Sequence, residues 1–215
     1  MKTLIRYIGL WLLIAGCLIF SFPLVTWVYG YGFQLYHRRQ FPPTATAPLL
    51  NTPSASSSNP TPFSPAVPAH SVIGRLEIPT LDISVMVVEG DDDGDLVRGA
   101  GHIPGTAIPG APGNVAIAGH RDTFFRPLRK IHPGDPINLT TDRGAYRYIV
   151  ESTEVTDPSN VSVLKAGSSP ELTLVTCYPF YFAGPAPQRY VVEASFKEAA
   201  AGEQRKINHR KGEEP

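Results

Sequence analysis

The C-terminal part of the sequence predicts an all-β fold, either a barrel or a sandwich of short strands. Between residues 71 and 197 the chain alternates short β-branched and apolar runs with turns rich in Gly, Pro and Asp. This pattern is typical of a protein built from about eight short strands. The segment is about 125 residues long, which is enough for one hydrophobic core.

Seven runs have the composition of strands. The run 172–177 is closed by Tyr178-Pro179, because proline cannot donate a hydrogen bond to a sheet ladder. A Gly/Pro-rich loop is expected at 99–113, and helical turns are expected at 91–95, at 123–129 and after Asp157-Pro158. The predicted strands span residues 72–78, 83–88, 114–118, 136–140, 146–156, 172–177 and 189–196.

The N-terminal part of the chain is expected to lie in a membrane. No charged side chain occurs between Tyr7 and Val28, and a run of this length matches one helix across a bilayer. Lys2 and Arg6 precede the run, which favours a cytoplasmic N-terminus. Two alternatives stay open, namely a cleaved signal peptide and lipidation of Cys17, which follows a run similar to the lipobox of bacterial lipoproteins. All three place the remainder of the chain outside the cytoplasmic membrane.

Composition divides the chain into five parts. Pro, Ser, Thr and Ala dominate residues 40–69, and such a segment behaves as a semi-extended, disordered tether because it buries too little apolar surface to fold. The parts are a cytoplasmic N-terminus at 1–6, a transmembrane anchor at 7–29, an extracytoplasmic linker at 30–70, the β domain at 71–197 and a polar tail at 198–215.

The charge balance argues against one class of function. The chain carries 19 Lys and Arg against 19 Asp and Glu, so it has no basic footprint for a nucleic acid. The Asp-rich run 91–95 lacks the spacing of a calcium-binding helix-loop-helix. Neither a metal site nor a cofactor is expected.

Cys177 is the leading candidate for chemistry. It ends a predicted core strand, so a rigid element would hold its thiol where the chain leaves the sheet. The chain has two cysteines, and with Cys17 in the membrane the two thiols cannot meet. Cys177 is therefore an unpaired thiol, either a small buried hydrophobe or a nucleophile.

A cysteine attacks as its thiolate and needs a base or a cation nearby. His120 has the best context of the six histidines, because it follows the apolar strand 114–118. Two strands that end at the same rim can bring His120 to Cys177. The other five histidines are weaker candidates. His37 is expected beside the membrane, His70 in the tether and His102 in the Gly/Pro-rich loop. His132 precedes a turn, and His209 lies in the tail.

Arg189 is the third candidate. Attack on a carbonyl builds negative charge on its oxygen, which a fixed cation stabilises. Arg189 begins the last predicted strand, and if that strand forms a hairpin with 172–177, its start lies beside Cys177. The alternative is an ordinary surface arginine in a salt bridge.

Several motifs resemble those of sortases, which are membrane-anchored cysteine transpeptidases. Thr173-Leu174-Val175-Thr176-Cys177 is similar to their Thr-Leu-x-Thr-Cys signature. The loop 178–190, the run Gly119-His120-Arg121-Asp122-Thr123-Phe124-Phe125 and the run 101–106 resemble class D sortases in particular. The resemblance covers about residues 72–196, and the anchor followed by a tether fits the architecture of the family.

The resemblance implies a closed eight-stranded β-barrel, with Cys177 as nucleophile, His120 as acid/base partner and Arg189 as the arginine that binds the substrate or the oxyanion. It implies cleavage after Thr of a sorting signal similar to Leu-Pro-x-Thr-Gly or, for class D, Leu-Pro-Asn-Thr-Ala. The signal would lie at the C-terminus of a secreted protein, and a thioacyl-enzyme would pass that protein to an amine of the cell envelope. The enzyme would be a single-pass protein of the cell membrane with an extracytoplasmic catalytic domain and no cofactor.

Two neighbours are secondary candidates for substrate binding or support. Asp122 is expected either to orient His120 as in a triad or to cap the following turn. Thr176 is expected either to line the substrate groove through its hydroxyl or to pack within its strand.

Three other interpretations compete with the transpeptidase. Enzymes of L,D-exchange on peptidoglycan resemble a Ser-x-Gly-Cys-x-Arg pattern, but here Pro179 stands where that pattern has Arg. A papain-like hydrolase has its Cys at a helix start and ahead of its His, the reverse of the order here. The non-enzymatic alternative is an anchored binding or assembly module with an inactive fold of the same kind.

Overall fold

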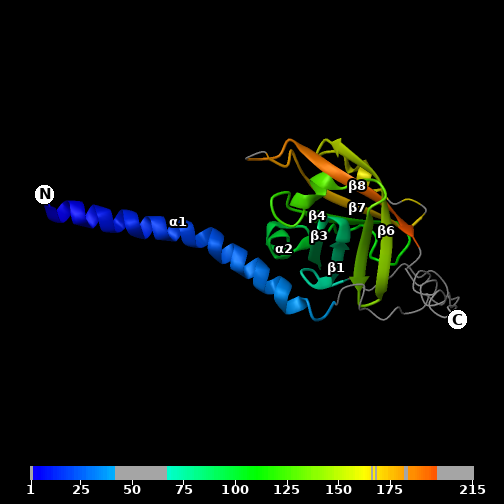
Figure 1. Ribbon diagram of the computed structural model, residues 1–215, viewed down its shortest axis with the longest axis horizontal. Helices are drawn as coiled ribbons and strands as arrows, with labels where there is room; N and C mark the ends of the chain where they lie inside the picture. The colour runs from blue at the N-terminus through cyan, green and yellow to red at the C-terminus, as the bar shows by residue number, and fades with distance from the viewer. Residues whose placement is uncertain (1, 42–66, 166, 168, 182–183, 198–215) are drawn as a thin grey trace, which may run out of the picture.

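Eight strands close into a barrel from which one long helix projects (Figure 1). The structure is a computed structural model of the chain and describes residues 2–41, 67–165, 167, 169–181 and 184–197. The prediction of a closed eight-stranded β-barrel is confirmed. Most of the expected tether, residues 42–66, and the expected tail, 198–215, lie outside the described residues.

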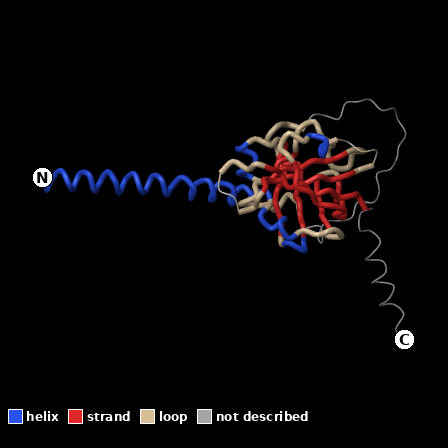
Figure 2. The backbone as a smooth tube through the Cα atoms, turned by 90° about the horizontal axis from the view of Figure 1, so that it is seen from above, coloured by secondary structure: helices blue, strands red, loops and turns tan. Residues whose placement is uncertain are grey.

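The strands follow one another around the barrel in the order β1-β2-β3-β4-β7-β8-β6-β5, and β5 pairs back onto β1. Two pairs are parallel, β2 with β3 and β4 with β7. Figure 2 shows the strands gathered in the centre of the domain, with the long helix to one side. The strands are β1 (Val72–Ile78), β2 (Ile83–Glu89), β3 (Ala100–His102), β4 (Asn114–Gly119), β5 (Pro136–Thr141), β6 (Gly144–Thr156), β7 (Glu171–Tyr178) and β8 (Gln188–Lys197).

Short helices connect some of the strands. Helix α2 begins in the Asp-rich run, where the carboxylate of Asp92 accepts a hydrogen bond from the backbone N–H of Asp95 at 2.9 Å and caps the helix. The turn predicted at 123–129 is a 3-10 helix that begins later, at Arg126. The short helices are η1 (Pro79–Leu81), α2 (Asp93–Arg98), η2 (Arg126–Lys130) and η3 (Val161–Leu164).

The seven predicted strands agree with β1, β2 and β4 to β8 to within two residues at each end. The strand that the prediction missed is β3, which lies inside the segment 99–113 that we expected to be a loop. It is only three residues long and has glycine at its centre and before its start. No alternation of apolar and polar residues can be recognised in such a short segment.

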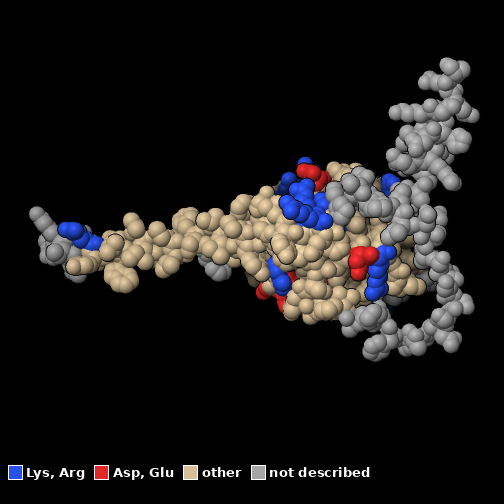
Figure 3. All heavy atoms as spheres, turned by 90° about the horizontal axis from the view of Figure 1, so that it is seen from below, with Lys and Arg blue, Asp and Glu red and all other residues tan. Residues whose placement is uncertain are grey.

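The N-terminal helix α1 (Lys2–His37) is a candidate membrane span by length and composition, over Arg6–His37. Figure 3 shows few charged side chains along it between its N-terminal end and the barrel. We placed the end of the anchor at residue 29 and the start of the linker at residue 30. In the structure the helix continues past residue 30, because residues 30–37 are still helical and Gln34 among them contacts α2 and β2.

A glutamine near the end of α1 hydrogen-bonds to both α2 and the barrel strand β2. The side-chain amide of Gln34 donates a hydrogen bond to the carbonyl of Arg98 at 2.6 Å and accepts one from the backbone N–H of Met86 at 2.8 Å. The backbone of α1 also approaches α2 closely, because a Cβ atom at Gly30 would lie 2.6 Å from the carbonyl oxygen of Val97. These contacts explain why the helix extends beyond its most apolar part.

Replacing Gln34 should therefore loosen α1 from the barrel. Gln34→Ala leaves the N–H of Met86 without this partner, and Met86 is buried. The cost of such a loss is about 1–3 kcal/mol. We expect hydrogen–deuterium exchange at Met86 to become at least several-fold faster in the full chain in detergent, with Gln40→Ala, a glutamine near the same helix end, unchanged. Equal exchange in Gln34→Ala and the wild type would contradict the docking.

Candidate active site

The parallel pairing of β4 with β7 brings two of the candidate residues to the same rim. Gly119, the last residue of β4, is the Cα partner of Thr176 in β7. His120 follows Gly119 and Cys177 follows Thr176. The imidazole and the thiol therefore come from residues that lie next to each other across the two paired strands. The expectation that these two strands end at one rim is confirmed.

The antiparallel pairing of β7 with β8 adds the arginine. Cys177 and Arg189 are Cα partners in this pair, and directly opposed residues of an antiparallel pair project from the same face of the sheet. The expected hairpin register is confirmed. Cys177 therefore lies between the end of β4 on one side and Arg189 on the other.

The alternation of side chains places the thiol on the outer face of the barrel wall. Leu172 and Leu174 of β7 point into the core and are fully buried, and Thr176 continues this inward series because every second residue of a strand shares a face. Cys177 belongs to the opposite, outward series and is half-buried. The sulfur is thus held by the core strand without being enclosed in the core.

Thr176 links the two strands beneath the candidate site. Its hydroxyl donates a hydrogen bond to the carbonyl of Gly119 at 2.7 Å, and both groups are buried. This geometry favours strand packing over the alternative that the hydroxyl lines a substrate groove. The bond joins the residue before His120 to the residue before Cys177.

Gly119 is required because an aromatic ring occupies the space beside it. A Cβ atom at this position would lie 2.6 Å from the ring of Phe125, which is fully buried in the core. The chain returns to this point after His120, whose carbonyl accepts a hydrogen bond from the N–H of Phe125 at 3.2 Å. The tight turn after β4 thereby sets the direction in which His120 leaves the strand.

Gly119→Ala is consequently expected to disturb both stability and the site. Overpacking a core of this kind costs about 1–3 kcal/mol, and relief of the clash would move the backbone of His120. We expect a lower midpoint of thermal unfolding and a slower reaction of Cys177 with an alkylating probe. Gly32→Ala is the control, because among the described residues nothing beyond its chain neighbours and the nearby backbone of its own helix lies within 4 Å of its Cβ position. An unchanged midpoint in Gly119→Ala would contradict the packing argument.

Neither expectation for Asp122 is seen in the described part of the chain. Asp122 is exposed, and no hydrogen bond joins its carboxylate to half-buried His120. The following 3-10 helix has Phe125 at its N-cap position and no side-chain capping bond. The structure therefore brings Cys177, His120 and Arg189 together and leaves Asp122 at the surface.

The surroundings of Arg189 include a carboxylate that the sequence analysis missed. Arg189 donates to the carbonyl of Gln188 at 3.1 Å and is the Cα partner of Thr156, the last residue of β6. Asp157 follows, and its pKa lies below the ordinary value, mainly because Ser159 donates hydrogen bonds to its carboxylate and partly because of the positive charge of Arg189. Only the pairing of β6 with β8 reveals that Asp157 and Arg189 are neighbours.

His102 has a structural environment. It lies on β3, contrary to its predicted place in a loop, and is 1% exposed. Its Nδ1 lies 2.7 Å from a carboxylate oxygen of Glu89, and its Nε2 donates to the carbonyl of Ala107 at 3.0 Å. Both ring nitrogens are therefore engaged, and His120 remains the histidine beside Cys177.

His70, assigned to the tether, instead contacts the start of α2. Ligand-type atoms of His70, Asp92 and Asp95 lie within 4.8 Å of one another. The fully buried carboxylate of Asp95 is already hydrogen-bonded, to His70 at 3.0 Å and to Arg98 at 2.6 Å. Arg98 and His70 thus already use the Asp95 carboxylate.

Fold and site together define a class of protein, a closed β-barrel that presents a thiol, an imidazole and a guanidinium at the end of a parallel strand pair. The family model described as the sortase domain matches residues 76–197. The chain belongs to the sortase family.

Among curated relatives, Sortase D of Bacillus subtilis is 37% identical over 120 residues, which cover 55% of this chain and 61% of that protein. Sortase A of Listeria monocytogenes is 33% identical over 111 residues, covering 50% of each. The matches thus span less than two thirds of the length of these relatives. The similarity to Sortase D agrees with the class D-like motifs.

Solved structures show the same relationship. A Sortase D5 transpeptidase of Clostridium perfringens superimposes with a TM-score of 0.56 at 30% identity, covering 61% of this chain and 82% of that one. Sortase A of Corynebacterium diphtheriae, a lid mutant, gives a TM-score of 0.58 at 28% identity over 63% of this chain and 75% of that one.

Proposed function

We propose that this protein is a membrane-anchored cysteine transpeptidase. The observation that carries the proposal is the strand register. Cys177 is the Cα partner of Arg189, and Cys177 and His120 each directly follow a residue of the last β4–β7 pair, Thr176 and Gly119. Membership of the sortase family supports the same reaction class.

In the proposed first half-reaction, the Cys177 thiolate attacks the carbonyl carbon of a Thr residue in the sorting signal of a secreted protein. Arg189 stabilises the negative charge that develops on the carbonyl oxygen. His120 gives a proton to the leaving amine, so the peptide bond breaks and a thioester forms. The signal is of the Leu-Pro-x-Thr-Gly or Leu-Pro-Asn-Thr-Ala kind.

In the second half-reaction, an amine of the cell envelope attacks the thioester. His120 removes a proton from that amine, an amide bond forms, and the Cys177 thiolate is released. The thioester retains the energy of the acyl group for this transfer. The secreted protein thereby becomes joined to the envelope.

The proposed location follows from the apolar length of α1 and from the basic residues at its N-terminal end. Its apolar length fits one membrane crossing, and the basic Lys2 and Arg6 favour a cytoplasmic N-terminus. Helix α1 would then be an uncleaved anchor that holds the barrel on the extracytoplasmic side of the cell membrane.

A peptide-library experiment tests this function. The full chain in detergent is incubated with peptides that vary around Leu-Pro-x-Thr, and the products are identified by mass. We expect cleavage after Thr, a covalent acyl adduct on the protein and, with added amine, a ligated product. Absence of both adduct and cleavage across the library would overturn the proposal and favour an inactive module.

A further inference from the structure

One arginine side chain bridges the two segments that carry the candidate nucleophile and base. Nη1 of Arg121 donates a hydrogen bond to the carbonyl of Pro179 at 3.1 Å, and Nη2 donates to the carbonyl of Gly184 at 2.8 Å. Arg121 directly follows His120, and Pro179 lies two residues after Cys177. A single guanidinium thus spans from the end of β4 to the connection between β7 and β8.

The chemistry of this bridge requires arginine. A guanidinium is planar and presents several N–H groups in a fixed fork, so it can hold two separate carbonyls in one geometry. A lysine ammonium at the same position would keep the charge without the fork. The two carbonyls belong to Pro179, directly after β7, and to Gly184, which precedes β8, so one guanidinium contacts the chain on both sides of this connection.

Two further contacts surround the same bridge. The guanidinium of Arg129 in η2 lies over the ring of Tyr181 at 5.2 Å, which ties the same connection to the segment after β4 a second time. Beneath the site, the hydroxyl of Thr176 binds the carbonyl of Gly119 at 2.7 Å. The segments that carry Cys177 and His120 are therefore joined by the Thr176–Gly119 hydrogen bond within the barrel wall and by the side chains of Arg121 and Arg129 in the loops.

We propose that Arg121 is a positioning residue of the transpeptidase site. By holding the β7–β8 connection against the segment that carries His120, it sets the position of the imidazole relative to the Cys177 thiol. The inference rests on the proposed function, and it assigns Arg121 no contact with the reacting atoms. Displacement of a catalytic group by about 1 Å can reduce a rate by about 100-fold, so the loss of this link is expected to slow the chemical step.

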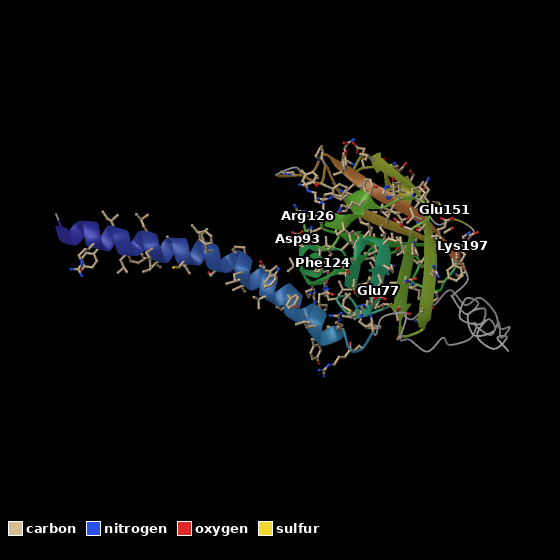
Figure 4. The ribbon with its side chains drawn as sticks, in the orientation of Figure 1. Glu77, Asp93, Phe124, Arg126, Glu151 and Lys197 are labelled. Carbon is tan, nitrogen blue, oxygen red and sulfur yellow. The ribbon has the colours of Figure 1, made fainter. Side chains whose placement is uncertain are left out.

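Arg126 provides a matched control. It lies in the same segment at the start of η2 and is exposed. Figure 4 shows Phe124, Arg126 and Asp93 on the side of the barrel toward which α1 extends, whereas Lys197 lies on the far side. Arg126→Ala thus removes a similar charge from the same region, and in the described part of the chain no hydrogen bond of its side chain is lost.

The experiment compares Arg121→Ala, Arg121→Lys and Arg126→Ala in the full chain in detergent, all with Cys17→Ala so that Cys177 is the sole thiol. We expect Arg121→Ala to lower kcat about 10- to 100-fold with KM within about 3-fold, because substrate contacts are retained. Arg121→Lys should recover part of the loss, and Arg126→Ala should match the wild type.

The pH profile of Cys177 alkylation is the second readout. If the link aligns His120 with the thiol, Arg121→Ala should raise the pH at which labelling reaches half of its maximal rate, because the thiolate loses its partner. A purely structural role would lower the unfolding midpoint and leave this profile unchanged.

These readouts separate the possible failures. An Arg121→Ala variant with wild-type kcat and labelling profile overturns the inference, and so does a loss of activity that accompanies unfolding with an unchanged profile. A wild-type chain that turns over no peptide counts against the proposed function, while the labelling profiles still decide the role of Arg121.

Discussion

Cys177→Ala should abolish both cleavage and transfer, with a loss of at least about 10⁴-fold in kcat, because removal of a covalent nucleophile eliminates the thioacyl route. The structure makes this expectation specific. Cys177 projects from the outward series of β7, so its replacement leaves the core packing of Leu172 and Leu174 intact. The loss should therefore occur without a large change in the unfolding midpoint.

The measurement is turnover of the best library peptide, together with the mass of the acyl adduct. Cys17→Ala is the control, because it removes the other thiol of the chain, which is exposed on α1. In that background a probe should label the native barrel quickly, and Cys177→Ala should remove the labelling. Turnover that survives in Cys177→Ala would exclude Cys177 as the nucleophile. Labelling of Cys177 in the native barrel no faster than in the unfolded chain would favour an inactive module.

Arg189→Ala is expected to reduce kcat about 100- to 1,000-fold, the usual effect of removing one donor to a developing oxyanion. The expectation rests on the Cα pairing of Arg189 with Cys177, which places both side chains on the same face of the sheet. Arg189→Lys should recover part of the activity, because it restores the charge without the planar donor geometry. KM should change less than kcat if the arginine acts mainly in the transition state.

Steady-state kinetics of the full chain in detergent test this expectation. Arg143→Ala serves as the matched control, because Arg143 is an exposed arginine in the turn between β5 and β6. Activity of Arg189→Ala within about twofold of the wild type would remove the arginine from the mechanism. A rise in KM at constant kcat would instead assign it to ground-state binding of the substrate.

The candidate site was predictable in its residues and only partly in its geometry. Cys177 and His120 each follow an apolar run that reads as a strand, and the Thr-Leu-x-Thr-Cys and Gly-His-Arg runs are recognisable without coordinates. Arg121 stood in one of these runs, but nothing in its local sequence indicates the carbonyls of Pro179 and Gly184 as its partners. Those contacts depend on the path of a connection that begins after β7.

Misplaced elements have similar explanations. His102 read as a loop residue because β3 is short and contains glycine, yet the neighbouring β2 and β4 bury it. The end of α1 read as linker because its apolar stretch fades, whereas contact of Gln34 with the barrel keeps it helical. In both cases tertiary contacts overrode a weak local preference.

Local residue chemistry was sufficient for the all-β class and for seven strands, because strand periodicity and turn residues act over a few positions, and the motifs it contains named Cys177, His120 and Arg189 as the candidate thiol, imidazole and guanidinium. Only the folded barrel decided that β4 lies parallel to β7, that Cys177 is opposite Arg189 and that the sulfur projects outward. Strand register between distant segments is set by packing of the whole sheet, and shifting it by one residue would turn every side chain to the other face.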